Sequence, residues 1–213
     1  MSAKLIVFDV DGVLLDTDRG STKDILVQLN KAQEVEALHR EYLKRRQSGP
    51  WGLPELMKLF AGYSRDELMM LSREYCSTHL MLGALETIQE LKRRSYEVGS
   101  ITSSIDIVAD ALLELLPLDW IEATTVQWND GVCAGDIVRK VDRFTKRDIL
   151  ADYMRQHQIQ KSEVIAVGDS ITDVPIADCA GEMIAFNATD SKIIERAEIY
   201  IKEKNLSSIL PYL

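Results

Sequence analysis

Two short acidic motifs in this chain have the residue types and spacing of a catalytic centre. The first, Asp9-Val10-Asp11-Gly12, comes directly after the apolar run Leu5–Phe8. Such a run predicts a buried strand of a parallel sheet, and the carboxyl ends of these strands face the crevice in which ligands bind. On an unbroken strand the side chains of Asp9 and Asp11 would lie on one face. One carboxylate could then attack a substrate while its neighbour transfers a proton. The alternative interpretation is an ordinary turn from strand to loop.

The second acidic motif is Gly168-Asp169-Ser170-Ile171-Thr172-Asp173, which follows the apolar run 164–167. Two carboxylates four residues apart, on a turn that enters a helix, can bind one hard cation. Mg²⁺ suits so few carboxylates because it retains several water ligands. Capping of an ordinary helix N-terminus is the alternative interpretation. The two motifs support each other, since the carboxyl ends of parallel strands meet at one edge of a sheet.

Two other positions could contribute groups that bind phosphate. Thr102, Ser103 and Ser104 follow a short predicted strand and precede a predicted helix, so they offer hydroxyls and backbone N–H groups at a helix N-terminus. A capping role is the alternative for them. Lys146 lies in the first turn of a later predicted helix, where its charge opposes the helix dipole. Lys140 is the other candidate for a catalytic cation.

The elements that would position these residues alternate between strand and helix. Apolar or alternating segments predict strands at 5–8, 96–101, 121–127, 132–138, 164–167, 183–186 and 199–201. Between the first two strands, residues 21–94 show only helical periodicity, and this stretch is too long for a simple crossover. We therefore expect an α/β fold, a doubly wound, Rossmann-like parallel sheet with an inserted small helical cap. Residues 1–15 and 83–213 would form the core, and 16–82 the cap.

Composition and charge restrict the class of partner. The 213 residues carry a formal net charge of -9, which argues against a surface for nucleic acid or anionic membranes. Cys76, Cys133 and Cys179 lack paired spacing and indicate free thiols in a reducing compartment. Without a signal peptide or a membrane-spanning run, we expect a cytoplasmic protein, as a monomer or homodimer. His39 lacks metal-ligand spacing and is interpreted as part of the solvated helix face 39–46.

The order of these motifs resembles that of the haloacid dehalogenase superfamily of phosphohydrolases, and the chain looks most like its phosphoserine phosphatase branch. The matching pieces are Asp9-Val10-Asp11-Gly12-Val13, Thr102, Lys146 and Gly168-Asp169-Ser170-Ile171-Thr172-Asp173. The helical insertion and the predicted hairpin around Asn129-Asp130-Gly131 extend the likeness over nearly the whole chain.

The resemblance implies a role for each matching residue. Asp9 would attack phosphorus and form an aspartyl-phosphate, while Asp11 would protonate the leaving oxygen and then activate water. The ligands of Mg²⁺ would be Asp9, the backbone carbonyl of Asp11, Asp169 and Asp173. The phosphoryl oxygens would be bound by Thr102, the backbone of Ser103 and Lys146.

The resemblance also implies that the helical cap closes over the site and contacts the leaving group. Asp18 stands where the branch uses an acidic residue, usually Glu, for the substrate amine. Lys58 or Arg65 lies nearest to the branch's Arg for the substrate carboxylate. Thr172 stands where the family often has Asn, and Thr102-Ser103-Ser104 replaces a common Ser-Gly-Gly. These departures concern the leaving group more than the phosphoryl chemistry.

The sequence thus predicts a Mg²⁺-dependent phosphatase for a small phosphorylated metabolite, with phosphoserine or a similar compound as first candidate. One alternative is a phosphotransferase that passes the phosphoryl group to a metabolite alcohol. Phosphate release with and without acceptor alcohols separates these two activities. The other alternative is a catalytically idle binding module on the same scaffold, which would not hydrolyse aryl phosphates in the presence of Mg²⁺.

Overall fold

The centre of the molecule is a seven-stranded sheet in the order β4-β3-β2-β1-β5-β6-β7, and the computed structural model describes residues 5–45 and 52–213. The strands are β1 (Leu5–Phe8), β2 (Glu97–Ile105), β3 (Trp120–Asn129), β4 (Val132–Arg139), β5 (Val164–Gly168), β6 (Glu182–Phe186) and β7 (Ile199–Ile201). Neighbouring strands are parallel except in the β3–β4 hairpin. Because the chain starts in the middle and extends the sheet on both sides, the fold is doubly wound, which confirms the predicted class.

Strand β2 is longer than the sequence predicts. The predicted strand ends at 101, whereas β2 continues to Ile105 and helix α6 (Asp106–Leu115) follows at once. The side chains of Thr102 and Ser104 are buried, and β3 pairs alongside with an irregular register between Ile101 and Ile105. Thr102–Ser104 therefore belong to the strand itself, and Ile105 alone separates them from the first residue of α6.

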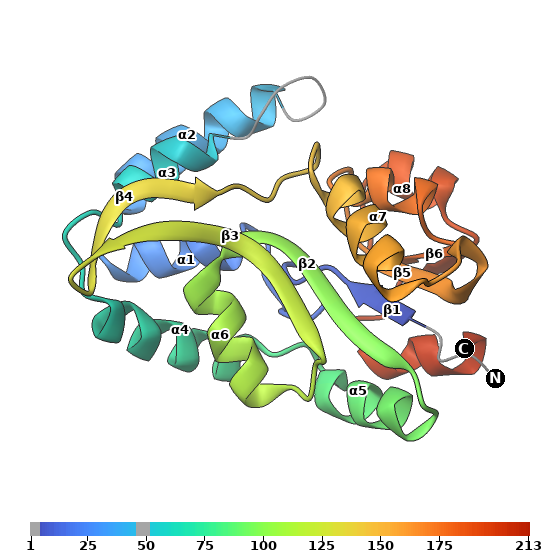
Figure 1. Cartoon of the computed structure of the whole chain (residues 1–213). Coiled ribbons are helices and arrows are strands. Elements are labelled where there is room, and N and C mark those ends of the chain that lie inside the picture. The colour runs from blue at the N-terminus through green and yellow to red at the C-terminus, as the bar shows by residue number, and fades with distance from the viewer. Residues whose placement is uncertain (1–4, 46–51) are drawn as a thin grey trace.

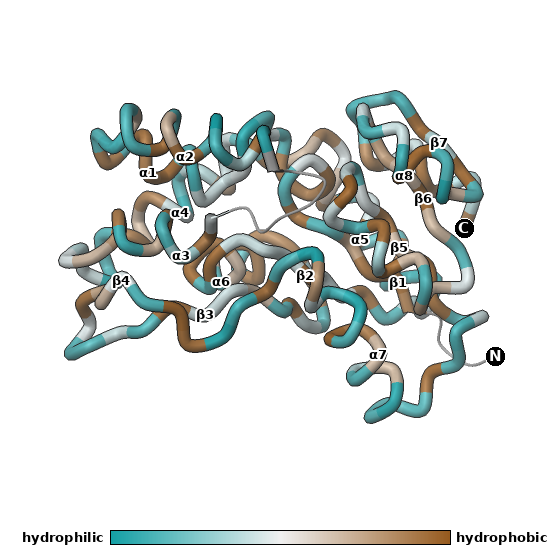
Figure 2. Tube along the Cα trace, turned by 90° about the horizontal axis from the view of Figure 1, so that it is seen from above, coloured by the Kyte–Doolittle hydropathy of each residue, from teal (hydrophilic) through white to brown (hydrophobic). Residues whose placement is uncertain are grey.

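Helices cover both faces of the sheet, as Figure 1 shows. In β1, Ile6 and Phe8 face one hydrophobic cluster, and Leu5 and Val7 face the other. This explains the unbroken apolar run of the strand, and Figure 2 shows the hydrophobic centre at β1 and β5. On one side lie α5 (Ala84–Arg93), α6 and the 3₁₀ helix η3 (Leu206–Tyr212); on the other lie α7 (Lys146–His157), α8 (Ser191–Arg196) and the 3₁₀ helix η2 (Val174–Asp178). A 3₁₀ turn, η1 (Lys161–Glu163), precedes β5.

The described residues between β1 and α5 form four helices and none of the named strands, in agreement with the predicted helical periodicity of this stretch. The helices are α1 (Ser21–Gln28), α2 (Ala32–Arg45), α3 (Leu53–Lys58) and α4 (Arg65–His79). The side chain of Ser64 caps α4 by accepting the N–H of Glu67. None of the described helices is both long and apolar enough to cross a membrane.

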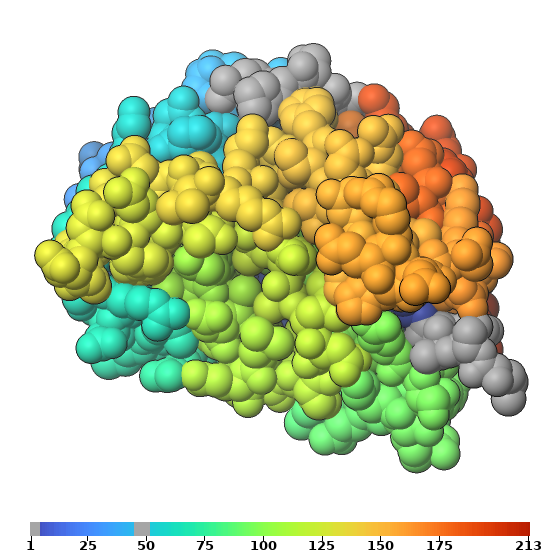
Figure 3. Space-filling view, viewed as in Figure 1, coloured from blue at the N-terminus to red at the C-terminus, as the bar shows by residue number. Residues whose placement is uncertain are grey.

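The segment that contains α3 and α4 is attached to the β3–β4 hairpin and to α6. The N–H of Gly62 donates to Cys133 of β4, and the N–H of Cys133 donates to Tyr63, so the loop after α3 joins the hairpin. Figure 3 shows the hairpin (yellow) against this part of the chain (cyan). Helix α4 packs on α6, and two surface ion pairs, Arg65–Asp110 and Arg73–Glu114, connect them.

The two chain crossings between the helical segment and the sheet lie side by side. The N–H of Met81 donates to Leu14 and the N–H of Asp16 donates to His79. The C-terminal segment contacts both crossings, because Lys204 pairs with Asp16 at 2.8 Å and the N–H of Leu206 donates to Leu82. These bonds join the places where the insertion begins and ends.

Candidate active site

The two acidic motifs meet at the carboxyl ends of β1 and β5, as the sequence predicts. Asp9 follows β1, and its N–H donates to the carbonyl of Val167 in β5 at 2.9 Å. Asp169 and Asp173 belong to the turn after β5. One carboxylate oxygen from each of Asp9, Asp169 and Asp173 lies within 4.8 Å of the other two. The three acids therefore form one cluster.

Helix α7 adds a cation to this cluster. The ammonium of Lys146 donates to Asp9 Oδ1 at 2.8 Å and to Asp173 Oδ1 at 2.7 Å, and the side chain is fully buried. Burial by itself lowers the pKa of Lys146, but the charges of Asp173 and Asp9 outweigh it, so the pKa is raised. Lys146 is thus a fixed positive charge. Lys140, the other candidate, pairs with Asp142 instead.

Negative charge still exceeds positive charge around Asp9. Burial and then the charge of Asp173 raise the pKa of Asp9 to about 7, against the opposing effect of Lys146. The pKa of Asp169 is also raised, by burial and then by Asp173 and Asp9. A buried group of carboxylates whose ionised forms are disfavoured is the electrostatic condition that a bound divalent cation relieves.

Two glycines lie against the carboxylates, at positions where a side chain would take up the space that the carboxylates fill. A Cβ on Gly12 would lie 2.4 Å from Asp169 Oδ2, and a Cβ on Gly168 would lie 2.5 Å from Asp173 Cβ. Any larger residue at either position would displace an acid of the cluster. The oxygen donors, their spacing and this absence of side chains together fit a small hard cation.

Asp11 lies outside the three-acid cluster. Strand β1 ends at Phe8, and the chain turns so that the N–H groups of Leu14 and Leu15 both donate to Val10. The premise of an unbroken strand through Asp9 and Asp11 is therefore wrong. Both residues nevertheless line the same pocket, which has a volume of about 200 Å³.

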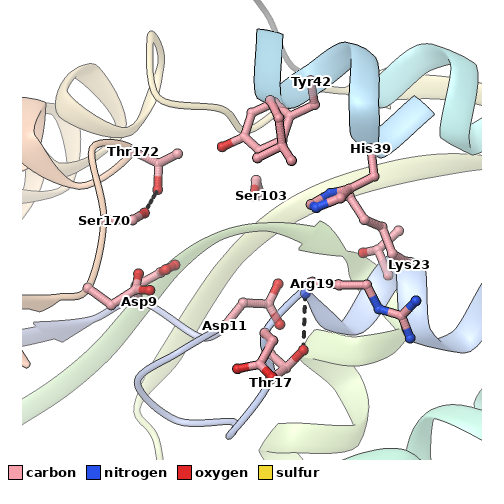
Figure 4. A pocket seen from close by; sticks show the side chains of 15 residues that line it. Asp9, Asp11, Thr17, Arg19, Lys23, His39, Tyr42, Ser103, Ser170 and Thr172 are labelled. Carbon is pink, nitrogen blue, oxygen red and sulfur yellow. Dashed lines mark hydrogen bonds between the residues drawn. The ribbon is translucent and has the colours of Figure 1, made fainter. Parts of the chain in front are cut away.

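The pocket has an acidic end and a more basic end (Figure 4). Asp9 lies at one end, beside Asp169 of the three-acid cluster, and Asp11 lies nearer the middle. Arg19, Lys23 and His39, from the segment that enters α1, from α1 and from α2, lie at the other end. Asp18, Tyr42 and Ser103 also line the pocket.

The remaining predicted site residues are divided between the pocket and its surroundings. Asp18, Ser103 and Thr172 line it, and the hydroxyl of Thr172 lies 2.9 Å from that of Ser170. Thr102 is buried, and its Oγ1 accepts the N–H of Ser104 at 3.0 Å. Lys146 is also buried, directly behind Asp9.

Sequence reasoning missed the basic end of the pocket. Neither Lys58 nor Arg65 is among the described residues that line it, and Arg65 instead pairs with Asp110 at 2.6 Å. Lys23 lines the pocket although it is only 4% exposed, with Nζ 3.1 Å from Nδ1 of His39. His39 therefore does not belong to a wholly solvated face. Lys23 is buried among neighbours that include the polar residues Ser21 and Thr22, so the sequence gives no signal of this wall.

Comparison with known proteins agrees with this geometry. The family model of haloacid dehalogenase-like hydrolases matches residues 6–178. The chain is 28% identical over 211 residues to phosphoserine phosphatase of Methanocaldococcus jannaschii, covering 99% of this chain and 97% of the relative. It is 30% identical over 213 residues to that of Wolinella succinogenes, covering 99% and 100%.

Similarity extends to solved structures. A phospho-aspartyl intermediate analogue of phosphoserine phosphatase superposes with a TM-score of 0.84 at 27% identity, covering 100% of both chains. The match to the family model spans most of the chain and includes both acidic motifs. The protein is therefore a phosphatase that belongs to the haloacid dehalogenase-like hydrolase family.

Proposed function

We propose that this phosphatase is Mg²⁺-dependent, forms an aspartyl-phosphate on Asp9 and hydrolyses a small phosphorylated metabolite, with phosphoserine or a similar phospho-hydroxy acid as the first candidate. The convergence of Asp169, Asp173 and Lys146 on Asp9 at the base of a pocket carries this proposal. The full-length similarity to phosphoserine phosphatases supports the choice of substrate class.

The proposed metal ligands are Asp9, Asp169 and Asp173, with the backbone carbonyl of Asp11. When bound, Mg²⁺ would reduce the repulsion between an anionic carboxylate and an anionic phosphate ester. Lys146 supplies part of the same compensation permanently, because its ammonium is already held between Asp9 and Asp173.

Asp9 and Asp11 account for both the formation and the hydrolysis of the aspartyl-phosphate. A carboxylate oxygen of Asp9 attacks phosphorus, the bond from phosphorus to the ester oxygen breaks, and Asp11 gives that oxygen its proton. Asp11, now ionised, takes a proton from the water that attacks the aspartyl-phosphate and frees Asp9. We assign the phosphoryl oxygens to Lys146, the N–H of Ser103 and the hydroxyl of Thr102.

The leaving group is assigned to the basic end of the pocket. We propose residues 16–82 as a cap whose Asp18 meets a substrate ammonium and whose Lys23 meets a carboxylate. Thr172 lies at the acidic end, where it can contact the phosphoryl group or the ester oxygen. Since both signs of charge are present, this wall suits an alcohol that carries an amine and a carboxylate.

The nucleophile is tested by Asp9→Asn. We expect phosphate release with Mg²⁺ to fall by about 10⁴-fold or more, because the amide cannot form the phosphorylated intermediate. The surface carboxylate variant Asp152→Asn serves as the control and should keep full activity. Acid quenching of the wild type during turnover, followed by peptide mass analysis, should locate a phosphoryl group on Asp9. Wild-type-like turnover by Asp9→Asn would overturn the assignment.

The leaving-group assignment is tested with three phosphate esters. Phosphoserine carries both an amine and a carboxylate, phosphoethanolamine only the amine, and phosphoglycolate only the carboxylate. Asp18→Ala should raise KM for the first two esters and spare phosphoglycolate. Lys23→Met should raise KM for phosphoserine and phosphoglycolate and spare phosphoethanolamine. Variants that change KM equally for all three esters would contradict these roles.

A further inference from the structure

Asp11 is held by two donors that come from different parts of the fold. Its Oδ1 accepts the N–H of Ser21 at 2.8 Å, and its Oδ2 accepts the hydroxyl of Ser104 at 2.6 Å. Ser21 is the first residue of α1 in the helical segment, whereas Ser104 lies near the end of β2. Both serines are buried, with exposed fractions of 0% and 1%. The carboxylate thus bridges the insertion and the sheet.

Asp11 also takes the place of a capping side chain for α1. The N-cap residue of this helix is Gly20, which has no side chain to accept the first N–H groups. The Asp11 carboxylate accepts one of them from outside the helix, and it lies at the positive end of the helix dipole. The start of α1 therefore fixes the orientation of the Asp11 carboxyl group.

The direction of the hydroxyl hydrogen bonds follows from the number of protons. Ser104 Oγ lies 2.6 Å from Asp11 Oδ2 and 2.8 Å from Ser21 Oγ. A serine hydroxyl has a single proton. Ser104 donates its proton to Asp11 Oδ2, so Ser21 must donate to Ser104. Donors aligned in one direction strengthen one another.

We propose that Ser104, oriented by Ser21, is a positioning residue for the proton transfer from Asp11 to the leaving oxygen. The inference rests on the function proposed above. In that step the O–H bond of the Asp11 carboxyl group breaks, and the proton joins the ester oxygen as its bond to phosphorus breaks. The negative charge that remains on Asp11 meets two donors that are already in place, so no reorganisation is required. Ser104 occupies a position at which the family pattern commonly has glycine, so this hydroxyl is an addition to that pattern.

The test compares two substrates that differ in their need for a proton. The p-nitrophenolate ion leaves readily without protonation, whereas an alkoxide such as that of phosphoserine or glycerol 2-phosphate does not. The parameter kcat/KM covers the steps up to release of the alcohol, which include the transfer from Asp11. We expect Ser104→Ala to lower kcat/KM about 10- to 100-fold on the alkyl ester, as for loss of a hydrogen bond to a charged group. On p-nitrophenyl phosphate we expect a loss of less than about threefold.

Ser21 and Ser72 complete the experiment. Ser21→Ala should give a smaller loss with the same substrate dependence, and the double variant should resemble Ser104→Ala alone, because Ser21 acts through Ser104. Ser72→Ala is the matched control: its hydroxyl is buried in α4 and has no hydrogen-bond partner in the described part of the chain. Ser72→Ala should leave kcat/KM unchanged on both substrates. If Ser104→Ala does not fold, the substrate ratio of Ser21→Ala decides the test.

The outcomes separate the inference from the proposed function. Equal losses on both substrates, or no loss on either, would overturn the positioning role of Ser104. Asp11→Asn provides the reference. If this variant loses kcat/KM selectively on the alkyl ester while Ser104→Ala keeps the wild-type kcat/KM on both esters, the positioning role is rejected and the proposed function is kept. Wild-type-like hydrolysis of both esters by Asp11→Asn would instead reject the proton transfer itself.

Discussion

The pKa of Asp9 links the charge of the active site to the stability of the protein. Burial and Asp173 raise it from an ordinary value of 3.8 to about 7 in the folded protein. Between these values the folded chain binds more protons than the unfolded chain, so the free energy of unfolding decreases as pH rises. The pKa of Asp169 is also raised, and this adds to the decrease in the free energy of unfolding. Without a bound cation, these acids therefore lower the free energy of unfolding most at neutral and higher pH.

Addition of Mg²⁺ should remove this penalty. We expect Mg²⁺ to raise the Tm clearly more at about pH 8 than at about pH 5.5, because protons compete with the cation for the same carboxylates. Thermal unfolding at both pH values, with Mg²⁺ or with a chelator, measures the difference. Asp9→Asn, which lacks one carboxylate, should respond more weakly at about pH 8. An equal Tm shift at the two pH values would contradict a shared site.

The two glycines Gly12 and Gly62 offer a matched test of the space around Asp169. Their φ angles are +93° and +88°, so alanine strains the backbone similarly at both, by about 1–2 kcal/mol. A Cβ on Gly12 meets the Asp169 carboxylate, whereas a Cβ on Gly62 meets nothing within 4 Å. We expect Gly12→Ala to lower Mg²⁺-dependent activity by about 100-fold or more through displacement of Asp169.

Gly62→Ala should lose stability but keep its activity. Circular dichroism and Tm establish that both variants are folded, and the Mg²⁺ dependence of activity separates them. Similar activities in the two variants would show that the position of Asp169 is less restricted than the structure indicates.

Helix α7 begins with Lys146, whose ammonium pairs with both Asp9 and Asp173. Lys146→Met would leave Asp9 and Asp173 buried beside each other without their ammonium. We expect a loss of about 3–5 kcal/mol in the free energy of unfolding at neutral pH, together with loss of activity. Lys92→Met removes an exposed lysine from its ion pair with Asp119 and should cost less than about 1 kcal/mol. Urea denaturation of both variants gives the comparison.

The strands and the acidic end of the site could be predicted from the sequence because both depend on local patterns. An apolar run such as Leu5–Phe8 indicates a strand covered on both faces, and residues just after parallel strands must share an edge. Asp9, Asp169 and Asp173 meet for this reason. The end of β2 could not be predicted, since Thr102 and Ser104 are polar and only their pairing and burial keep them in the strand.

The basic end of the pocket could not be predicted, for a different reason. Which side of α1 or α2 faces the acids depends on how these helices pack on one another and on α4. Helical periodicity specifies an apolar face but not the partner that this face meets. His39 and Tyr42 therefore had the pattern of a solvated surface, and Lys58 and Arg65 could be assigned to the site only from their place in the order of the chain.

At the scale of the whole molecule, the helices of the insertion differ in their attachment. The crossings at Leu14–Met81 and Asp16–His79 are paired with each other, and α4 is packed on α6. Helix α2 instead contacts α1 and α3, and it contributes His39, Tyr42 and Leu43 to the pocket. Helix α1 is also held, by α4, by β2 and by the hydrogen bond of Ser21 to Asp11. Rearrangement on binding is therefore expected within α2 and not as a swing of the whole insertion.

Hydrogen exchange can test this expectation. Binding of orthovanadate with Mg²⁺ should slow amide exchange at the start of α1 and in α2, because these elements line the pocket. Amides in α4 should exchange at the same rate with and without the analogue, since α4 is held by α6 in both states. A comparable change throughout α1–α4 would instead indicate that the insertion moves as one body.

The acids of the pocket follow the ends of β1 and β5, and its opposite wall comes from α1 and α2. Under the proposed assignment, bond cleavage and the choice of the leaving group therefore depend on different elements of the fold. A library that randomises only Lys23, His39, Tyr42 and Leu43 would sample new alcohol partners while the hydrolytic apparatus stays intact. The same separation would allow related enzymes to diverge in the phosphate esters that they hydrolyse while they keep the same reaction chemistry.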